Sequence, residues 1–263
     1  MPEGHTLHGL ARDQTRHFAG RRVRVTSPQG TFAAGAALID GRVLDKVSAH
    51  GKHLFAAFGE RIVHVHLGLF GKYTAGAGDP PDPRGALRMR WVAEQQWTDL
   101  RGATACEVLH PSEVHTILAR LGPDPLRPNT KGDAAYARIA KRRVPIAALL
   151  MDQTVLSGVG NVYRAEILFR HGIPPYLPGR DLAEDQWVAL WTDLVILMRA
   201  GLRSGRIVTT RPTHRERQRG FIRNADAHYV YRRTGLSCRV CATPIAMRLL
   251  AARKLYWCPT CQA

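Results

Sequence analysis

The sequence predicts an α+β protein, in which an N-terminal helix and an antiparallel β-sandwich precede a helical domain that ends in a four-cysteine zinc ribbon. Three observations support this fold class. Between residues 21 and 110, short runs of alternating apolar and polar residues are separated by glycine-containing turns, which favours antiparallel sheets over βαβ units. After residue 128, apolar residues recur at helical spacing. The last complete motif has the form C-x2-C-x16-C-x2-C.

The first element is an amphipathic helix that we expect over residues 4–18. Leu7, Leu10 and Ala11 fall on one face of this helix, and Gly20 is a typical stop signal. The β-like runs that follow are expected to form the two layers of the sandwich. These runs are Arg22–Thr26, Val43–Val47, His53–Phe58, Arg61–Leu67, Ala86–Ala93 and Ala105–Leu109.

A proline-rich stretch without periodicity, Leu121-Gly-Pro-Asp-Pro-Leu-Arg-Pro128, marks the expected domain boundary. Beyond it the pattern is helical, with a basic loop at 209–220. The predicted helices are 133–141, 145–156, Asn161–Arg170 and 181–202. We therefore predict three parts, namely an N-terminal domain at 1–121, a helical domain at 122–226 and a zinc-binding hairpin at 227–263.

The charge balance points to a polyanionic partner. The 263 residues include 38 Lys and Arg against 21 Asp and Glu, which gives a formal net charge of +17 and a pI near 10.5. Nucleic acid is the default partner of such a chain. The alternatives are that the chain is a ribosomal protein or that it binds an anionic membrane surface. No apolar stretch has the length of a membrane span, and no signal peptide opens the chain. We expect a monomeric cytoplasmic protein that does not bind a membrane.

The cysteines favour a structural metal site. Cys238 and Cys241 form one pair and Cys258 and Cys261 the other, and each C-x2-C can turn two thiolates toward one zinc ion. Two disulfides or four unrelated cysteines are the alternative. The absence of a secretory signal and the single further cysteine, Cys106, argue against disulfides. Four sulfur ligands leave no open position on the metal, so one structural rather than catalytic Zn²⁺ is expected.

A possible phosphate site lies between two of the predicted helices. The segment Ser157-Gly-Val-Gly160 is a tight turn, and Asn161 after it is predicted to be the N-cap of the next helix. Backbone N–H groups at the positive end of a helix suit a phosphate-sized anion. The alternative is an ordinary helical hairpin with a good cap. In a chain of charge +17, a DNA phosphate contact is the favoured interpretation.

Four separate motifs resemble the formamidopyrimidine-DNA glycosylase/endonuclease VIII (Fpg/Nei) family, whose helical domain is a helix–two-turn–helix. They are Pro2-Glu3, Gly51-Lys-His-Leu54, Leu156-Ser-Gly-Val-Gly-Asn-Val-Tyr-Arg-Ala-Glu166 and Tyr256-Trp-Cys-Pro-Thr-Cys-Gln262. They occur in the family's order and span almost the whole chain. The resemblance implies a base-excision repair enzyme that flips an oxidised base out of damaged double-stranded DNA and removes it.

The resemblance implies the catalytic residues. With Met1 removed, Pro2 presents a secondary amine that attacks C1′ of the damaged nucleoside and forms a Schiff base. Glu3 matches the family's acid, which assists opening of the sugar ring. Lys52 matches the β-elimination lysine that also contacts phosphate, and Arg253 matches the δ-elimination arginine of the ribbon. A chance Pro-Glu start and a surface turn lysine are the alternatives.

The resemblance also implies the DNA contacts. Asn161 matches the phosphate-contacting asparagine of the helix–two-turn–helix. Leu69 and Phe70 match the loop that fills the space left by the flipped nucleotide, although a strand end packed in the core is a competing interpretation. Arg120 matches a DNA-contacting arginine of the endonuclease VIII branch, and Arg101 takes the place of an inserted arginine.

Two departures indicate the branch. The formamidopyrimidine enzymes carry Asp-Pro-Arg-Arg-Phe-Gly, whereas this chain has Asp99-Leu-Arg-Gly-Ala-Thr104. A separate departure, Ala252 where that branch usually has a glycine before the ribbon arginine, concerns the local turn geometry and not the branch. The Pro-Glu-Gly start also favours endonuclease VIII, whose preferred lesions are oxidised pyrimidines. An oxidised-purine glycosylase and a non-catalytic damaged-DNA-binding protein remain the alternatives.

Overall fold

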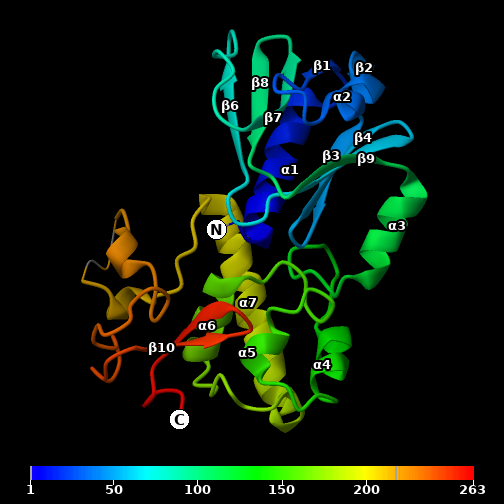
Figure 1. The fold of residues 1–263 in the computed structure, drawn as a ribbon. Coiled ribbons are helices and arrows are strands. Elements are labelled where there is room, and N and C mark those ends of the chain that lie inside the picture. The colour runs from blue at the N-terminus through cyan, green and yellow to red at the C-terminus, as the bar shows by residue number, and fades with distance from the viewer. Residues whose placement is uncertain (1, 217, 219) are drawn as a thin grey trace. The chain divides into compact units, whose positions relative to one another are not determined.

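The computed structural model describes residues 2–216, 218 and 220–263, and the chain folds into two compact units (Figure 1). The first unit runs to Arg120 and the second comprises Leu121–Ala263. The first is a β-sandwich with helices, and the second is helical with one β-hairpin near its end. The mixed α+β fold predicted from the sequence is therefore confirmed.

The first unit consists of nine strands and three helices among its described residues. The helices are α1 (Gly4–Phe18), α2 (Ala33–Ile39) and α3 (Pro111–Arg120). The strands are β1 (Arg22–Thr26), β2 (Arg42–Val43), β3 (Lys46–His50), β4 (His53–Phe58), β5 (Arg61–His66), β6 (Lys72–Ala77), β7 (Leu87–Ala93), β8 (Gln96–Arg101) and β9 (Ala105–Leu109).

The strands form two antiparallel sheets, ordered β2-β1-β7-β8-β6 and β3-β4-β5-β9. A single apolar core joins them, and α1 packs against β3 and β4. At its centre the buried Trp91 ring meets Phe18 and Phe58 edge to face, with ring centroids 5.8 and 5.7 Å apart. Edge-to-face contacts of this kind add to the stabilisation that comes from burying the rings. The core fixes α1 against the sheet from which the β3–β4 turn projects.

Two predictions for this unit are corrected. The run Val43–Val47 is not one strand, because β2 ends at Val43 and pairs in one sheet while β3 begins at Lys46 and pairs in the other. The chain crosses between the layers there, with Leu44 buried on the way. The sequence pattern also missed β6, β8, α2 and α3. β6 contains small residues such as Gly76 and Ala77 that carry little strand signal.

The second unit contains four α-helices and one hairpin among its described residues. The helices are α4 (Asp133–Ile139), α5 (Ile146–Leu149), α6 (Asn161–Arg170) and α7 (Glu184–Ser204), and the hairpin strands are β10 (Ala246–Leu250) and β11 (Arg253–Trp257). One apolar cluster lies around Tyr163, Trp187 and Leu190, and a second holds the ribbon residues Cys258 and Ile245. The hairpin is thus packed onto the helices.

The predicted helix over 145–156 is wrong beyond Leu149. After that residue the chain turns, and the carboxylate of Asp152 accepts hydrogen bonds from the Thr154 backbone N–H and hydroxyl, at 2.9 and 2.7 Å. The Gln153 amide bonds the Met151 carbonyl and the Gly158 N–H. Side chains of this type compete with the helix for backbone groups, so the segment becomes a turn.

Among the described residues, no helix combines the length and the apolar character needed to cross a membrane.

Candidate metal centre and nucleic-acid interface

The four cysteines of the ribbon converge on one point. Their sulfur atoms all lie within 4.8 Å of one another, with Cys238 Sγ and Cys261 Sγ 3.9 Å apart and Cys241 Sγ and Cys258 Sγ 3.4 Å apart. A disulfide needs about 2.05 Å, so these pairs are free thiols. In a tetrahedral S4 site with Zn–S bonds of about 2.3 Å, neighbouring sulfurs stand about 3.8 Å apart. The residues therefore fit a metal ion with four sulfur ligands.

The sequence predicted Asn161 as the N-cap of α6, and this prediction is wrong. Gly160 occupies that position, and Asn161 is the first helical residue. The side-chain amide of Asn161 donates from Nδ2 to the Lys254 carbonyl at 2.9 Å, and its Oδ1 accepts from Arg164. The asparagine therefore joins the helix to the ribbon strand β11, because its acceptor lies on the other element.

Arg253 stands at the tip of the ribbon, exposed, as the first residue of β11. The two-residue turn before it, Ala251-Ala252, has φ values of 49° and 58°. Both residues lie in the left-handed region, as a type I′ hairpin turn requires. Alanine reaches this region at a cost of about 1 kcal/mol or more per residue, so the turn is strained. Alanine in place of glycine at position 252 therefore leaves the type of turn unchanged but strains its backbone.

A buried carboxylate anchors the segment that leads into the ribbon. Glu166, fully buried on α6, accepts hydrogen bonds from the backbone N–H groups of Tyr229, Val230 and Tyr231 at 2.7, 2.8 and 2.8 Å, and from the Thr209 hydroxyl. A carboxylate can be buried only when its lone pairs are satisfied in this way. Glu166 thus fixes the path of the chain between α7 and the cysteines.

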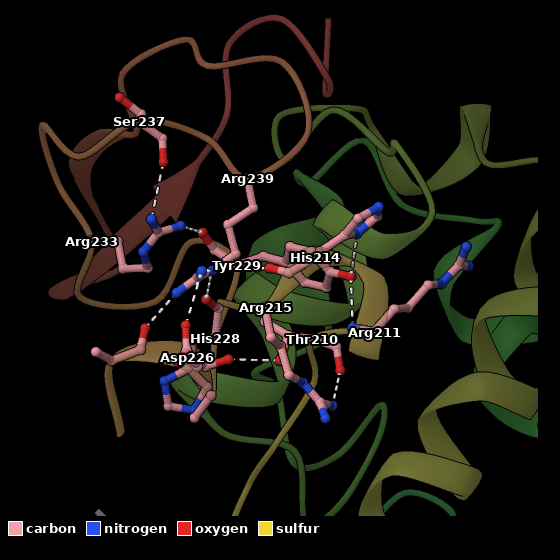
Figure 2. A network of polar contacts seen from close by, with 12 residues as sticks. Thr210, Arg211, His214, Arg215, Asp226, His228, Tyr229, Arg233, Ser237 and Arg239 are labelled. Atoms are coloured by element: carbon pink, nitrogen blue, oxygen red, sulfur yellow. Dashed lines mark hydrogen bonds and ion pairs between the residues drawn. The ribbon is translucent and has the colours of Figure 1, made fainter. Parts of the chain in front are cut away.

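Around this segment lies a network of basic side chains (Figure 2). The Tyr229 hydroxyl accepts from the Arg211 backbone N–H at 2.9 Å and lies 2.9 Å from His214 Nδ1, and the network also contains an ion pair of 3.2 Å between Arg239 and Asp226. Arg211 and its neighbours are held by these bonds near the ribbon. The predicted basic loop 209–220 is therefore ordered at its start, while residues 217 and 219 lie outside the described part of the chain.

In the first unit, Pro2 and Glu3 lead directly into α1. Pro2 is half-buried and Glu3 is fully buried, and the Glu3 carbonyl accepts from the Thr6 N–H at 2.9 Å. Glu3 takes the N-cap position of the helix, with extended backbone. Burial lowers the pKa of the neighbouring His5 to about 4, so this imidazole is neutral at pH 7. Glu3 is thus a buried carboxyl group directly before the first turn of α1.

Lys52 lies on the tight turn between β3 and β4, after Gly51 with φ +57°. The next residue, His53, belongs to a chain of side chains across the sheet. His64 Nε2 lies 2.9 Å from His53 Nδ1, and His64 Nδ1 lies 2.8 Å from Glu107 Oε1. Because an ionised carboxylate only accepts, His64 donates from Nδ1 to Glu107. These contacts hold β4, the strand that directly follows Lys52.

Two histidines of this sheet, His53 and His66, have lowered pKa values. Burial, together with neighbouring histidine and cationic side chains, lowers the pKa of His53 to about 3. Burial also lowers the pKa of His66, and the nearby His64 and Lys52 add to the effect. The imidazoles of His53 and His66 are therefore uncharged at pH 7, and Lys52 is a cation close to His66.

Leu69 and Phe70 project from the turn after β5 and are 44% and 85% exposed. The competing interpretation, a strand end packed in the core, is wrong for both side chains. Gly68 makes this turn with φ +65°, and a Cβ at Gly68 would lie 1.9 Å from the Thr104 hydroxyl oxygen. Leu69 and Phe70 are adjacent in the sequence, so the turn presents two apolar side chains to its surroundings.

Arg101 and Arg120 differ in how they are held. Arg101, with 18% of its side chain exposed, pairs with Asp99 at 2.9 Å and also donates to the Thr74 hydroxyl at 2.9 Å. Asp99 is fully buried and also pairs with Arg90 at 2.6 Å. Arg120 ends α3, is exposed, and adds to the positive charge that acts on His53. Arg101 is therefore built into the sheet, whereas Arg120 is open to a partner.

The structure brings some predicted site residues together within each unit. In the second unit, the metal ligands, Asn161 and Arg253 are linked through β11. In the first, Glu3 directly precedes α1, Lys52 stands on the turn between β3 and β4, and α1 packs against both of these strands. Sequence reasoning missed Arg164 and Glu166, although charged residues amid the apolar spacing of 161–170 were an available signal.

Comparison with known proteins places these features. Residues 1–106 match the family model of the formamidopyrimidine-DNA glycosylase N-terminal domain, and residues 121–213 match that of the formamidopyrimidine-DNA glycosylase H2TH domain. The chain is 52% identical over 267 residues to Endonuclease 8 1 of Mycobacterium tuberculosis, with 100% of each chain covered. It is 32% identical over 282 residues to the formamidopyrimidine-DNA glycosylase of Geobacter sulfurreducens, again with 100% of each covered.

Solved structures share the fold. A structure of MutM in complex with DNA containing carbocyclic 8-oxo-G has a TM-score of 0.82 at 19% identity, and 99% of each chain is covered. A complex of Lactococcus lactis Fpg with DNA containing an abasic site has a TM-score of 0.81 at 19% identity, with the same coverage.

Proposed function

Since this chain belongs to the formamidopyrimidine-DNA glycosylase/endonuclease VIII family of base-excision repair glycosylases, we propose that it is a bifunctional DNA glycosylase and abasic-site lyase that removes oxidised pyrimidines from double-stranded DNA. The observation that carries the proposal is the 52% identity to Endonuclease 8 1 over the whole chain. The lower identity to a formamidopyrimidine-DNA glycosylase, 32%, favours the pyrimidine branch over an oxidised-purine glycosylase.

The reaction begins when the damaged nucleotide is flipped out of the duplex and the exposed Leu69 and Phe70 fill the gap. Pro2, freed of Met1, is an α-amine with a pKa of about 8, so part of it is uncharged near neutrality. Its nitrogen attacks C1′, the bond from C1′ to the base breaks, and an iminium forms. The buried Glu3 donates a proton to the sugar ring oxygen as the ring opens.

Two eliminations follow from the iminium. Loss of a proton from C2′ and departure of the 3′ phosphate complete β-elimination, with Lys52 beside the leaving phosphate. Loss of a proton from C4′ and departure of the 5′ phosphate complete δ-elimination, with Arg253 at the ribbon tip. A cation near each leaving phosphate stabilises the developing negative charge. Asn161 and Arg120 contact further phosphates, and a DNA contact of Arg101 stays a prediction because its nitrogens are engaged within the first unit.

The metal in this proposal is one Zn²⁺ bound by Cys238, Cys241, Cys258 and Cys261. Bound there, it supplies structure and no open coordination position, because four thiolates complete its tetrahedral shell. The chemistry stays with the side chains at the hairpin tip and at the other end of the chain. We also keep the division into parts at 1–121, 122–226 and 227–263 as a proposal.

Borohydride trapping tests the nucleophile. Protein whose N-terminus is shown by mass spectrometry to begin at Pro2 is mixed with abasic-site DNA and reduced. A covalent adduct is expected, and Pro2→Gly, which turns the secondary amine into a primary one, is expected to reduce the adduct without weakening DNA binding. Absence of any adduct from correctly processed protein would refute the enzyme and favour a non-catalytic damaged-DNA-binding protein.

Excision assays test the lesion class. Duplexes that contain thymine glycol or dihydrouracil are compared with duplexes that contain 8-oxoguanine, at equal enzyme concentration. Faster release of the pyrimidine lesions is expected. Faster release of 8-oxoguanine would replace this part of the proposal with the oxidised-purine activity.

A further inference from the structure

Arg164 is a fully buried arginine in the middle of α6 that contacts three elements. Its Nη2 donates to Asn161 Oδ1 in the same helix and to the Lys254 carbonyl of β11 at 3.1 Å. Its Nη1 lies 3.4 Å from the Ala147 carbonyl of α5. Burying a guanidinium costs free energy unless it is hydrogen-bonded. The folded state therefore favours positions of α5 and β11 that keep these acceptors within reach of Arg164.

The Lys254 carbonyl receives two donors, Asn161 Nδ2 at 2.9 Å and Arg164 Nη2 at 3.1 Å. A carbonyl oxygen has two acceptor positions, and here both are used from the same helix. This fixes the main chain of β11 at the residue directly after Arg253. Lys254 is the second residue of β11, and it follows the strained turn and the exposed Arg253 directly.

Arg164 also determines which way the Asn161 amide faces. Because the arginine has donors only, it must meet the oxygen of that amide, and the nitrogen then faces Lys254. Asn161 therefore uses its oxygen and one N–H inside the unit and keeps one N–H for another acceptor. The same guanidinium thus sets the geometry of both Asn161 and the hairpin.

We propose that Arg164 is a positioning residue for the second elimination, because its clamp on Asn161 and on the Lys254 carbonyl fixes where the Arg253 guanidinium stands. This inference rests on the proposed function of Arg253. It assigns to the arginine no contact with DNA. The proposal predicts different effects on the two elimination steps. β-elimination uses Lys52 of the first unit and does not depend on the clamp, whereas δ-elimination does.

The test is a single-turnover assay on abasic-site DNA in which β- and δ-elimination products are separated on a gel. Arg164→Met keeps the length of the side chain but removes its donors. We expect the ratio of δ to β product to fall roughly tenfold, as small misplacements of a catalytic group do, while the borohydride-trapped adduct and the metal content are unchanged. An unchanged ratio in this folded, metal-containing variant would overturn the inference.

Arg170→Met is the matched control. Arg170 is also on α6 and is 13% exposed, but it bonds Asp193 at 2.7 Å and not the hairpin. Its loss is expected to destabilise the unit while leaving the δ to β ratio unchanged. An equal fall of the ratio in both variants would mean that general loosening of α6 is responsible, and this also would overturn the inference.

A second arm covers the case in which Arg164→Met does not fold. Arg164→Lys keeps the positive charge but offers a single nitrogen, so it cannot reach both elements. We expect an intermediate ratio and faster amide hydrogen exchange in residues 246–257, with the first unit unaffected. Unchanged protection of 246–257 would refute the clamp. If wild-type protein gives no adduct, the proposed function fails, and the exchange measurement still decides the clamp.

Discussion

One sheet of the first unit and the helices of the second bury polar groups in different ways. The sheet β3-β4-β5-β9 buries a row of imidazoles, in which His53 and His64 stack with ring centroids 5.1 Å apart and His64 contacts the half-exposed Glu107. The helical unit buries charged groups, namely the Glu166 carboxylate and the Arg164 guanidinium, beside the four cysteines of the candidate metal site. Acid is therefore expected to weaken the first unit through this row of imidazoles, whereas loss of a charged partner or of the metal is expected to weaken the second.

The largest effect is expected from metal removal. Chelation, or Cys258→Ser, removes the site that ties the ribbon together, and structural zinc sites contribute roughly 10 kcal/mol or more to folding in small domains. We expect hydrogen exchange to become fast throughout residues 238–261 while peptides from β4 and β5 keep their protection. Loss of protection in both units would break the comparison. Metal content is measured on the same samples.

The next largest effect concerns Glu166. Glu166→Ala leaves the N–H groups of Tyr229, Val230 and Tyr231 without the carboxylate that they bond. Breaking such a buried set costs about 3–5 kcal/mol, and we expect a loss of this size in urea unfolding of the second unit. Glu184→Ala, at an exposed first-turn position of α7, is the control and should cost less than about 1 kcal/mol. Equal losses would show that the buried carboxylate is not special.

Acid should separate the units. The folded-state pKa values of His5 and His53, about 4 and about 3, lie below the ordinary value of 6.5. Between pH 6.5 and these values, the unfolded chain therefore binds more protons than the folded chain does. Their contribution to stability is complete above pH 6.5 and is lost as the pH falls toward 4 and 3. Burial alone would raise the pKa of Asp193, but bonds from His171 and Arg170 lower it to about 2, so this carboxylate keeps its charge down to much lower pH.

The corresponding measurement is thermal unfolding at pH 7 and pH 5. We expect the first unit to lose more stability than the second, and His53→Asn, which keeps a donor toward His64 but does not titrate in this range, to lose less than wild type. His115→Asn, at an exposed position on α3, should behave as wild type does. Parallel losses in both units would contradict the assignment of acid sensitivity to the histidine sheet.

The smallest effect is expected at the hairpin tip. Ala252→Gly relieves a positive φ of 58°, and after allowing for the added freedom of the unfolded chain we expect a gain of about 0.5 kcal/mol in local stability. Ala189→Gly, on the exposed face of the helix α7, should instead cost about 1 kcal/mol. Opposite signs in urea unfolding sharpen the contrast between strained and relaxed alanines. The same sign for both would mean that the turn is not strained.

Elements specified by local pattern could be predicted from the sequence. Gly4–Phe18, His53–Phe58 and Asn161–Arg170 carry an apolar period and clear stops, and the structure has helices and strands with these bounds. The segments that failed depend on strand pairing or on side-chain hydrogen bonds and not on an apolar period. Val43–Val47 divides because its two ends pair with different sheets, and 145–156 opens because Asp152 and Gln153 bond nearby backbone. Neither event leaves a periodic signal.

The candidate site follows the same rule. Cysteine spacing predicted a cluster of sulfurs correctly, because two residues between ligands fix the local geometry. Asn161 was assigned to a cap because caps are local, but its partner at Lys254 lies 93 residues away in the sequence. Arg164 was not singled out for the same reason. The roles of Pro2, Glu3 and Lys52 come from the family resemblance, and the experiments above are what tests them.

The clamp on β11 recognises a main-chain oxygen and not a side chain. Residue 254 can therefore change its side chain over evolutionary time without disturbing the clamp, as long as the backbone stays in the strand. Arg164 and Asn161 have no such freedom, because their side chains supply the donors. Among related enzymes, we expect positions 161 and 164 to vary together and position 254 to drift. A variable residue at position 254, next to an arginine at 253, would then accompany a pair at 161 and 164 in which neither residue changes without the other.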